Sequence, residues 1–148
     1  MTQWLNDDEQ AAWRDFLFGV NRLLEHLDHS LQENDGIPLT DYEILVFLSD
    51  SEGHQLRMSE IADHVLVSRS RLTSRVDRLV EQGLVVRSEA SDDRRGLYAE
   101  LTPLGLELLS EAAKTHVADV RSHLMDHIAA DDLPAFSRVW KSVAEFTG

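Results

Sequence analysis

Residues 68–102, SRSRLTSRVDRLVEQGLVVRSEASDDRRGLYAELT, decide the fold of this chain. Ser68 predicts the start of a helix, because a serine hydroxyl accepts a hydrogen bond from one of the first unpaired amides. Gly83 predicts its end, because glycine adopts the left-handed backbone at the lowest cost. Between them the apolar residues recur at the spacing of one helical stripe, at Leu72, Val76, Leu79 and Val80. The stretch therefore begins with an amphipathic helix.

A β-hairpin is predicted directly after this helix. Residues 84–86 are apolar and indicate a short strand that ends at Arg87. The returning strand shows the alternation of a half-buried strand, at Leu97, Ala99 and Leu101. The polar tip between the strands carries Arg94 and Arg95. Arginine at a hairpin tip suits the narrow minor groove of DNA, where the negative potential is enhanced.

The polar face of the helix is basic and rich in hydroxyl groups. It holds four arginines and no lysine within ten residues, and the guanidinium fork matches phosphate oxygens and guanine edges. A short helix is predicted just upstream, over residues 58–65, at the spacing of a helix-turn-helix, whose second helix enters the major groove. The candidate DNA contacts are Arg69, Ser70, Arg71, Thr73, Ser74, Arg75 and Arg78 on the helix, with Arg94 and Arg95 on the hairpin. The alternative is an ordinary solvated helix face.

Charge is divided unevenly along the chain. The 148 residues carry a net charge of −13, which by itself argues against a nucleic-acid partner. Residues 57–95 nevertheless hold 8 of the 14 basic residues and have a net charge of +1, whereas residues 1–56 and 96–148 have net charges of −10 and −4. Acidic surfaces elsewhere would repel DNA and orient the basic edge toward it. The overall acidity therefore does not exclude DNA binding.

Composition and motifs exclude other classes of protein. The chain has no cysteine, which excludes disulfides and thiol redox sensing. Its N-terminus is acidic, without the apolar segment of a signal peptide, and no run approaches the roughly 20 apolar residues of a membrane span. No glycine-rich phosphate loop or nucleophile elbow is present. We expect one structural domain in a cytoplasmic protein that is not an enzyme, has no cofactor and does not contact a membrane.

Two helices are predicted before the helix-turn-helix. Asn6 or Asp7 begins the first, which continues to about residue 33. Its length of roughly 40 Å is more than a small core can cover, so part of it is expected to meet another chain. A capping box of Thr40 and Glu43 predicts the start of the second helix.

Two further helices are predicted after the hairpin. Thr102 and Pro103 begin a long one, with apolar positions as far as Ile128, and a last helix follows Asp131. The expected fold is mainly α with a small β-hairpin wing. It comprises an N-terminal dimerisation helix in residues 1–38, a winged helix-turn-helix in residues 39–102 and C-terminal dimerisation helices in residues 103–148.

This ordered set of residues resembles the MarR family of winged helix-turn-helix transcription regulators. The resemblance covers nearly the whole chain. Ser91 departs from it, since the family often has proline there, and the lack of cysteine argues against a peroxide sensor. The residues that carry the resemblance are Leu39, Thr40, Ser59 to Ala62, Ser68, Thr73, Asp77, Leu79, Gly83, Leu84, Val85, Arg87, Asp93, Arg94, Arg95, Leu101, Thr102 and Gly105.

The resemblance implies a function. The basic helix face reads or flanks the major groove, and Arg94 and Arg95 enter the minor groove. A two-fold homodimer binds a pseudo-palindromic site on double-stranded DNA, with half-sites about one helical turn apart. Repression relieved by a small ligand is the usual mode of the family, although the sequence does not distinguish a repressor from an activator. The alternative is a winged helix that binds another protein through its acidic dimer surface.

The resemblance also implies an effector site between the dimer helices and the winged unit. A small aromatic or anionic effector fits, because aromatic rings supply contact area and an arginine or histidine pairs with a carboxylate. The plainer interpretation, which we favour, makes the candidates ordinary core and interface residues. The candidates are Trp13, Phe16, Arg22, His26, Tyr42 and Phe47.

Seven histidines raise a metal-responsive regulator as a further alternative. His26 and His29 are three residues apart, and His123 and His127 are four apart on one predicted helical face with Asp119. A zinc site needs three or four ligands of settled geometry, and the sequence has no compact four-ligand motif. We therefore assign no metal ligand and interpret these histidines as solvated or interface residues.

Overall fold

The computed structural model describes residues 1–65, 68–89 and 97–147. It confirms a mainly helical chain with a small sheet. The chain divides into two compact units, Met1–His116 and Val117–Gly148. The helices are α1 (Asp7–Asp35), α2 (Leu39–Asp50), α3 (Met58–His64), α4 (Arg69–Glu81), α5 (Pro103–His123) and α6 (Leu133–Thr147), and the strands are β1 (Gln55–Arg57), β2 (Val85–Glu89) and β3 (Leu97–Leu101). The predicted division into three functional parts stays a prediction.

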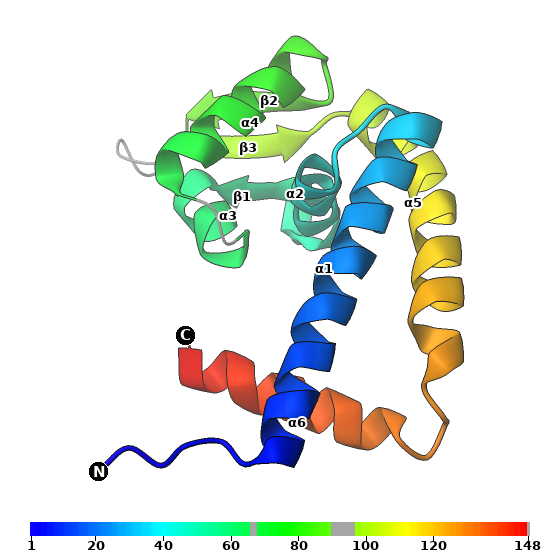
Figure 1. Ribbon diagram of the computed structural model, residues 1–148. Coiled ribbons are helices and arrows are strands. Elements are labelled where there is room, and N and C mark those ends of the chain that lie inside the picture. The colour runs from blue at the N-terminus through cyan, green and yellow to red at the C-terminus, as the bar shows by residue number, and fades with distance from the viewer. Residues whose placement is uncertain (66–67, 90–96, 148) are drawn as a thin grey trace. The chain divides into compact units, whose positions relative to one another are not determined.

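Helix α1 begins and ends as its sequence predicts, and it runs as one long continuous helix (Figure 1). Asn6 and Glu9 form a capping box, in which the Glu9 amide donates to Asn6 Oδ1 at 2.9 Å and the Asn6 amide donates to Glu9 Oε2 at 2.8 Å. Gly36 ends the helix in the left-handed conformation, with φ of 69°. Only the second half of α1 contributes buried residues, Leu27 and Leu31.

The predicted capping box of α2 is wrong. The helix begins at Leu39, so Thr40 already lies inside it. The N-cap residue is Pro38, whose side chain makes no hydrogen bond to the first turn. The Leu39 amide instead donates to Asp28 Oδ1 of α1 at 2.8 Å. A carboxylate from another helix therefore satisfies one of the amides that a local cap would otherwise serve.

The hairpin is part of a three-stranded antiparallel sheet, with β3 between β1 and β2 (Figure 1). Strands β2 and β3 pair from Val85 opposite Leu101 to Glu89 opposite Leu97, which confirms the predicted hairpin. Strand β1 was not predicted; it places Leu56 opposite Ala99. Its pairing ties the segment before α3 to the wing.

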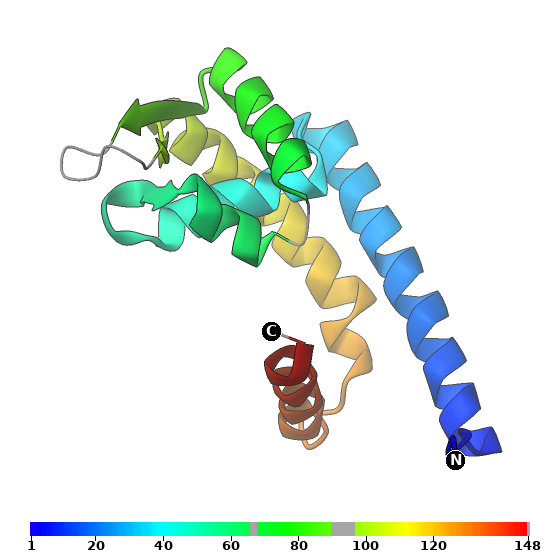
Figure 2. The same cartoon turned by 90° about the vertical axis from the view of Figure 1, so that its left-hand side faces the viewer.

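The core of the first unit forms beneath α4. The predicted apolar stripe is buried at Leu72, Val76 and Leu79, whereas Val80 is only half-buried. Helix α4 contacts α2, α3 and β2, and Figure 2 shows it beside α3 and the hairpin. The other fully buried large side chains are Leu31, Ile44, Leu45, Leu48, Ile61 and Val85.

The C-terminal helices differ in part from the prediction. Thr102 caps α5 as expected, because its Oγ1 accepts the Gly105 amide at 3.0 Å. The helix ends at His123, earlier than the predicted Ile128, because Leu124 has a non-helical backbone with φ of −132°. A 3-10 turn, η2 (Met125–His127), follows. The predicted last helix is confirmed as α6.

Candidate nucleic-acid interface

Helix α4 presents the predicted basic face to solvent. Ser68 caps it, since its Oγ accepts the Arg71 amide at 3.4 Å. Because the apolar stripe is buried in the core, the side chains on the opposite side of the helix point outward. The exposed predicted contacts are Arg69, Ser70, Arg71, Thr73, Ser74 and Arg78.

The hydroxyl groups on this face donate within the helix. Thr73 Oγ1 donates to the Arg69 carbonyl at 2.9 Å, and Ser74 Oγ donates to the Ser70 carbonyl at 3.2 Å. Their oxygen lone pairs therefore remain available to accept hydrogen bonds from a ligand. Within residues 1–65, 68–89 and 97–147, Arg69, Arg71 and Arg78 form no ion pair. The face offers unneutralised guanidiniums and hydroxyl acceptors together.

Arg75 differs from its neighbours, because its guanidinium already has a partner. Its Nη1 donates to Asp41 Oδ1 at 2.8 Å. Asp41 is 3% exposed, and the Arg75 side chain is half-buried. Its predicted contact with DNA stays a prediction, and it would compete with this ion pair.

Arg87 is a functional candidate that the sequence did not single out. It lies on β2 and donates to Asp77 Oδ1 and, at 3.3 Å, to the Thr73 carbonyl on α4. The wing strand is thereby tied to the exposed side of α4. Both Arg87 and Asp77 belong to the residues that carry the family resemblance, but no spacing rule indicates that a helix residue and a strand residue pair.

The wing arginines Arg94 and Arg95 lie outside the described residues. The strands that flank them pair as far as Glu89 and Leu97. Their role in the minor groove therefore stays a prediction.

The six candidate effector residues lie in separate places. Trp13 and Phe16 contact each other on α1, with ring centroids 5.8 Å apart. Further along the same helix, Arg22 and His26 line a polar surface depression. Tyr42 and Phe47 line a different one on α2, of about 430 Å³. The two depressions have no lining residue in common.

The depression at Tyr42 also contains residues that the sequence did not single out. It is lined by Tyr42, Glu43, Val46, Phe47, His64 and His116. The Tyr42 ring lies 4.7 Å from that of His116, and the Phe47 ring lies 5.1 Å from that of His64. Burial raises the pKa of Tyr42, and the negative charge of Asp35 raises it further. Burial also raises the pKa of the Glu43 carboxyl.

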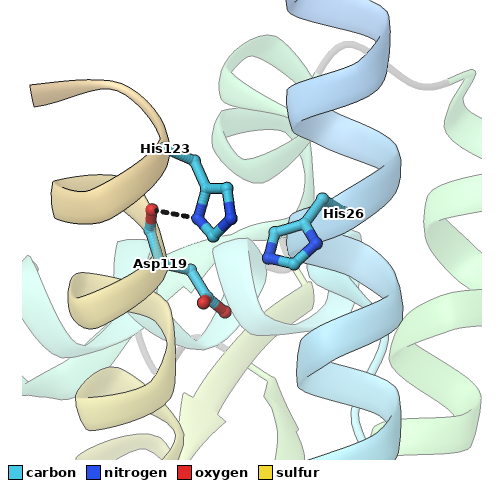
Figure 3. A group of neighbouring side chains, drawn as sticks. All are labelled: His26, Asp119 and His123. Carbon is cyan, nitrogen blue, oxygen red and sulfur yellow. Dashed lines mark hydrogen bonds between the residues drawn. The ribbon is translucent and has the colours of Figure 1, made fainter. Parts of the chain in front are cut away.

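Of the two histidine pairs, His26 and His29 lie on one helix, α1, where both line the same depression. His29 Nε2 lies 3.2 Å from Glu33 Oε1. His123 Nδ1 lies 3.0 Å from the Asp119 carbonyl oxygen on the preceding turn of α5 (Figure 3). Because α5 ends at His123, His127 lies in the 3-10 turn. The predicted common helical face of His123 and His127 is therefore wrong.

The chain is similar to known proteins with the same order of helices and strands. A family model described as the MarR family matches residues 35–96. The crystal structure of AbsC, a MarR family transcriptional regulator from Streptomyces coelicolor, is 43% identical, covers 99% of this chain and 98% of its own, and has a TM-score of 0.93. The chain belongs to the MarR family. The family consists of transcriptional regulators, so the predicted class is confirmed and the enzyme class is excluded.

Two other relatives add detail. Sco3205, a MarR family transcriptional regulator from Streptomyces coelicolor whose crystal structure contains DNA, is 36% identical, covers 98% of this chain and 91% of its own, and has a TM-score of 0.94. The transcriptional repressor MprA from Escherichia coli (strain K12) is 33% identical over 99 residues, which are 62% of this chain and 56% of MprA. In the described part of this MarR-family chain, no helix is long and apolar enough to cross a membrane.

Proposed function

We propose that this MarR-family protein is a homodimeric, sequence-specific DNA-binding repressor. The observation that carries the proposal is the exposed face of α4, where Arg69, Arg71 and Arg78 form no ion pair within the described residues. Charge of this kind binds phosphate, and guanidiniums also recognise guanine in the major groove. The DNA complex of Sco3205 supports the same use of this fold. Because its proposed target is promoter DNA, the protein is also proposed to be cytoplasmic.

The parts of the interface have different roles in this proposal. The face of α4 enters the major groove, where the side chains of Ser70, Arg71 and Ser74 read or flank the base edges. Arg94 and Arg95 contact the minor groove from the wing. Arg87, through Asp77, holds the wing strand against α4, so both grooves are contacted in a fixed register.

A second copy of the chain covers the exposed apolar side chains of α1 and α6. On α1, Trp13 and Phe18 are 52% and 70% exposed, and on α6 Val139 and Phe146 are 52% and 90% exposed. Apolar side chains of this size gain free energy when they leave water. A two-fold dimer then presents two copies of α4, which favours a pseudo-palindromic operator.

The proposed regulation is release from DNA by a small effector. The name of MprA supports repression. The depression at Tyr42 and Phe47 suits an aromatic ring, whereas Arg22 and His26, which would pair with a carboxylate, lie elsewhere on α1. The effector proposed for this depression is therefore a small aromatic molecule.

Selection of bound duplexes from a random DNA pool tests the proposal. At about 100 mM salt, where phosphate contacts still contribute, the wild type is expected to enrich a pseudo-palindromic sequence. Arg71→Gln should weaken that enrichment, and Arg138→Gln, at an exposed position of α6, is the matched control. If no sequence is enriched at this or lower salt, the DNA-binding proposal fails and a protein-interaction module is favoured.

A further inference from the structure

Asp41 is the buried charged residue of the described chain, at 3% exposure. A carboxylate removed from water is costly unless it is paired. Its partner is Arg75, whose Nη1 lies 2.8 Å from Asp41 Oδ1. The pair joins α2 to the middle of the recognition helix α4. A buried ion pair is strongly disrupted when one partner is removed, because the other charge is left without compensation.

The position of the pair gives it control over the rotation of α4. Asp41 lies in the first turn of α2, where the helix dipole favours a negative charge. The start of α2 is in turn held to α1 by the bond from the Leu39 amide to Asp28. Arg75 follows Arg71 by four residues and precedes Arg78 by three, so the three side chains are neighbours on one side of α4. Through Arg75, the Asp41 carboxylate therefore fixes the side of α4 next to Arg71 and Arg78.

We propose that Arg75 is a positioning residue: its ion pair with Asp41 sets the rotation of α4 on α2, so that Arg71 and Arg78 face the DNA. This inference rests on the proposed function, and it revises the role predicted for Arg75 from the sequence. Arg71 and Arg78 are exposed and form no ion pair within the described residues. Arg75 is committed to a carboxylate in the interior. It therefore acts on DNA through the placement of its helix.

Positioning and phosphate contact leave different signatures. A side chain that neutralises a phosphate contributes about one unit to the slope of log affinity against log salt. A positioning residue makes no phosphate contact of its own. Its loss misaligns the side chains that read the base edges, so affinity falls while the slope stays almost unaltered. Asp41 is buried and acidic, so it does not contact DNA directly. If it acts only through Arg75, changes at the two positions must be strongly non-additive.

The experiment compares Asp41→Asn, Arg75→Gln and the double variant with the wild type. Affinity for the duplex selected by the wild type is measured over a series of salt concentrations, well below the unfolding midpoint of each variant. Each single variant is expected to bind roughly 3- to 30-fold more weakly, the range of mutations that alter coupling at a distance. The double variant should bind no more weakly than the weaker single, with an unchanged salt slope. Asp50→Asn, exposed at the end of α2, controls for charge removal, and Arg94→Ala, at a predicted phosphate contact in the wing, is the control that should lower the slope.

Other outcomes overturn the inference. A slope lowered by about one unit in Arg75→Gln, with tighter binding by Asp41→Asn, would make Arg75 a phosphate contact. Lower unfolding midpoints with wild-type affinity would make the pair a stabilising contact alone. If the single variants do not fold, the double variant is measured instead, because it leaves no unpaired buried charge. An unchanged salt slope in the double variant supports positioning, and a slope lowered by about one unit supports a phosphate contact. If the wild type selects no duplex, both the proposed function and this inference are wrong. If the wild type binds but the variants do not behave as expected, only the inference about Arg75 is wrong.

Discussion

Asp28 on α1 caps α2, because its Oδ1 accepts the hydrogen bond of the Leu39 amide at 2.8 Å. The other carboxylate oxygen accepts from Gln32 Nε2 at 2.6 Å, which holds the side chain in place. Asp28→Ala should lower the free energy of unfolding by about 1 kcal/mol, the usual cost of a lost cap. Urea denaturation measures this loss. Asp15→Ala, exposed on the same helix, is the control; an equal effect at both positions would contradict the capping role.

Gly105 allows α5 to approach the chain that leads into β2. A Cβ atom at this position would lie 2.1 Å from the Leu84 carbonyl oxygen and 2.7 Å from Leu101 Cδ1. Since the first of these is backbone, the helix must shift. Gly105→Ala is expected to lower the free energy of unfolding by at least about 2 kcal/mol, as thermal or urea unfolding would show.

Gly19 supplies the matched control for this prediction. It lies inside α1, and an added Cβ would meet nothing within 4 Å. Alanine is the better helix former, so Gly19→Ala should raise the free energy of unfolding by about 0.5–1 kcal/mol. If Gly105→Ala were also neutral or stabilising, the close approach of α5 to Leu84 would be wrong.

The wing and the recognition helix should respond differently to substitution. Arg94→Ala or Arg95→Ala is expected to weaken binding to many sequences, to leave the consensus nearly unchanged and to lower the salt slope by roughly one unit. Arg71→Ala or Ser74→Ala should instead alter base preference, because these side chains lie on the exposed face of α4. Affinities measured on a panel of single-base variants of the operator separate the two effects. Unchanged affinity in both wing variants would remove the wing from the mechanism.

The local elements of the fold could be predicted from the sequence because each has a local cause. The periodicity of α4 follows from the burial of one stripe, and Gly83 has the left-handed backbone that ends it, with φ of 74°. The capping roles of Asn6, Ser68 and Thr102 depend on partners three residues away. Short-range hydrogen bonds of this kind are visible in sequence spacing.

The elements that the sequence missed depend on partners far along the chain. Strand β1 has three residues, too few to show an alternating pattern, and it forms because β3 lies beside it. Thr40 and Glu43 match a capping box, but the carboxylate of Asp28 from α1 serves the start of α2. The end of α5 before Ile128 has no local signal of the same strength, since the apolar spacing continues past it.

In the candidate site too, some features could be predicted from local sequence and others depend on distant partners. The exposure of Arg69, Arg71 and Arg78 follows from helical phase once the buried stripe is known. The pairing of Arg75 with Asp41, 34 residues earlier, does not follow from phase, because Arg75 lies at the boundary between the two faces. At such a boundary, the nearest tertiary partner decides whether a side chain serves the core or the surface.

Glu43 should make stability depend on pH. Burial raises the pKa of its carboxyl above the ordinary value of 4.5, so ionisation is harder in the folded protein than in the unfolded chain. The stabilising contribution of the protonated form is fully present below that ordinary value and is lost as the pH rises through the folded pKa. At neutral pH the ionised side chain therefore disfavours folding.

Glu43→Gln removes this effect, and the variant should be more stable than the wild type at pH 7. Glu43 is exposed as a residue although its carboxyl is partly buried, so solvent screens its charge and the gain should be only a few tenths of a kcal/mol. Urea unfolding of both proteins between about pH 4 and pH 7 measures the difference, which should shrink toward the acid end because the wild-type carboxyl becomes neutral there. Glu107→Gln, at an exposed position of α5, controls for the loss of one negative charge. A gain that is the same at every pH, or that grows toward acid, would show that burial of Glu43 is not its cause.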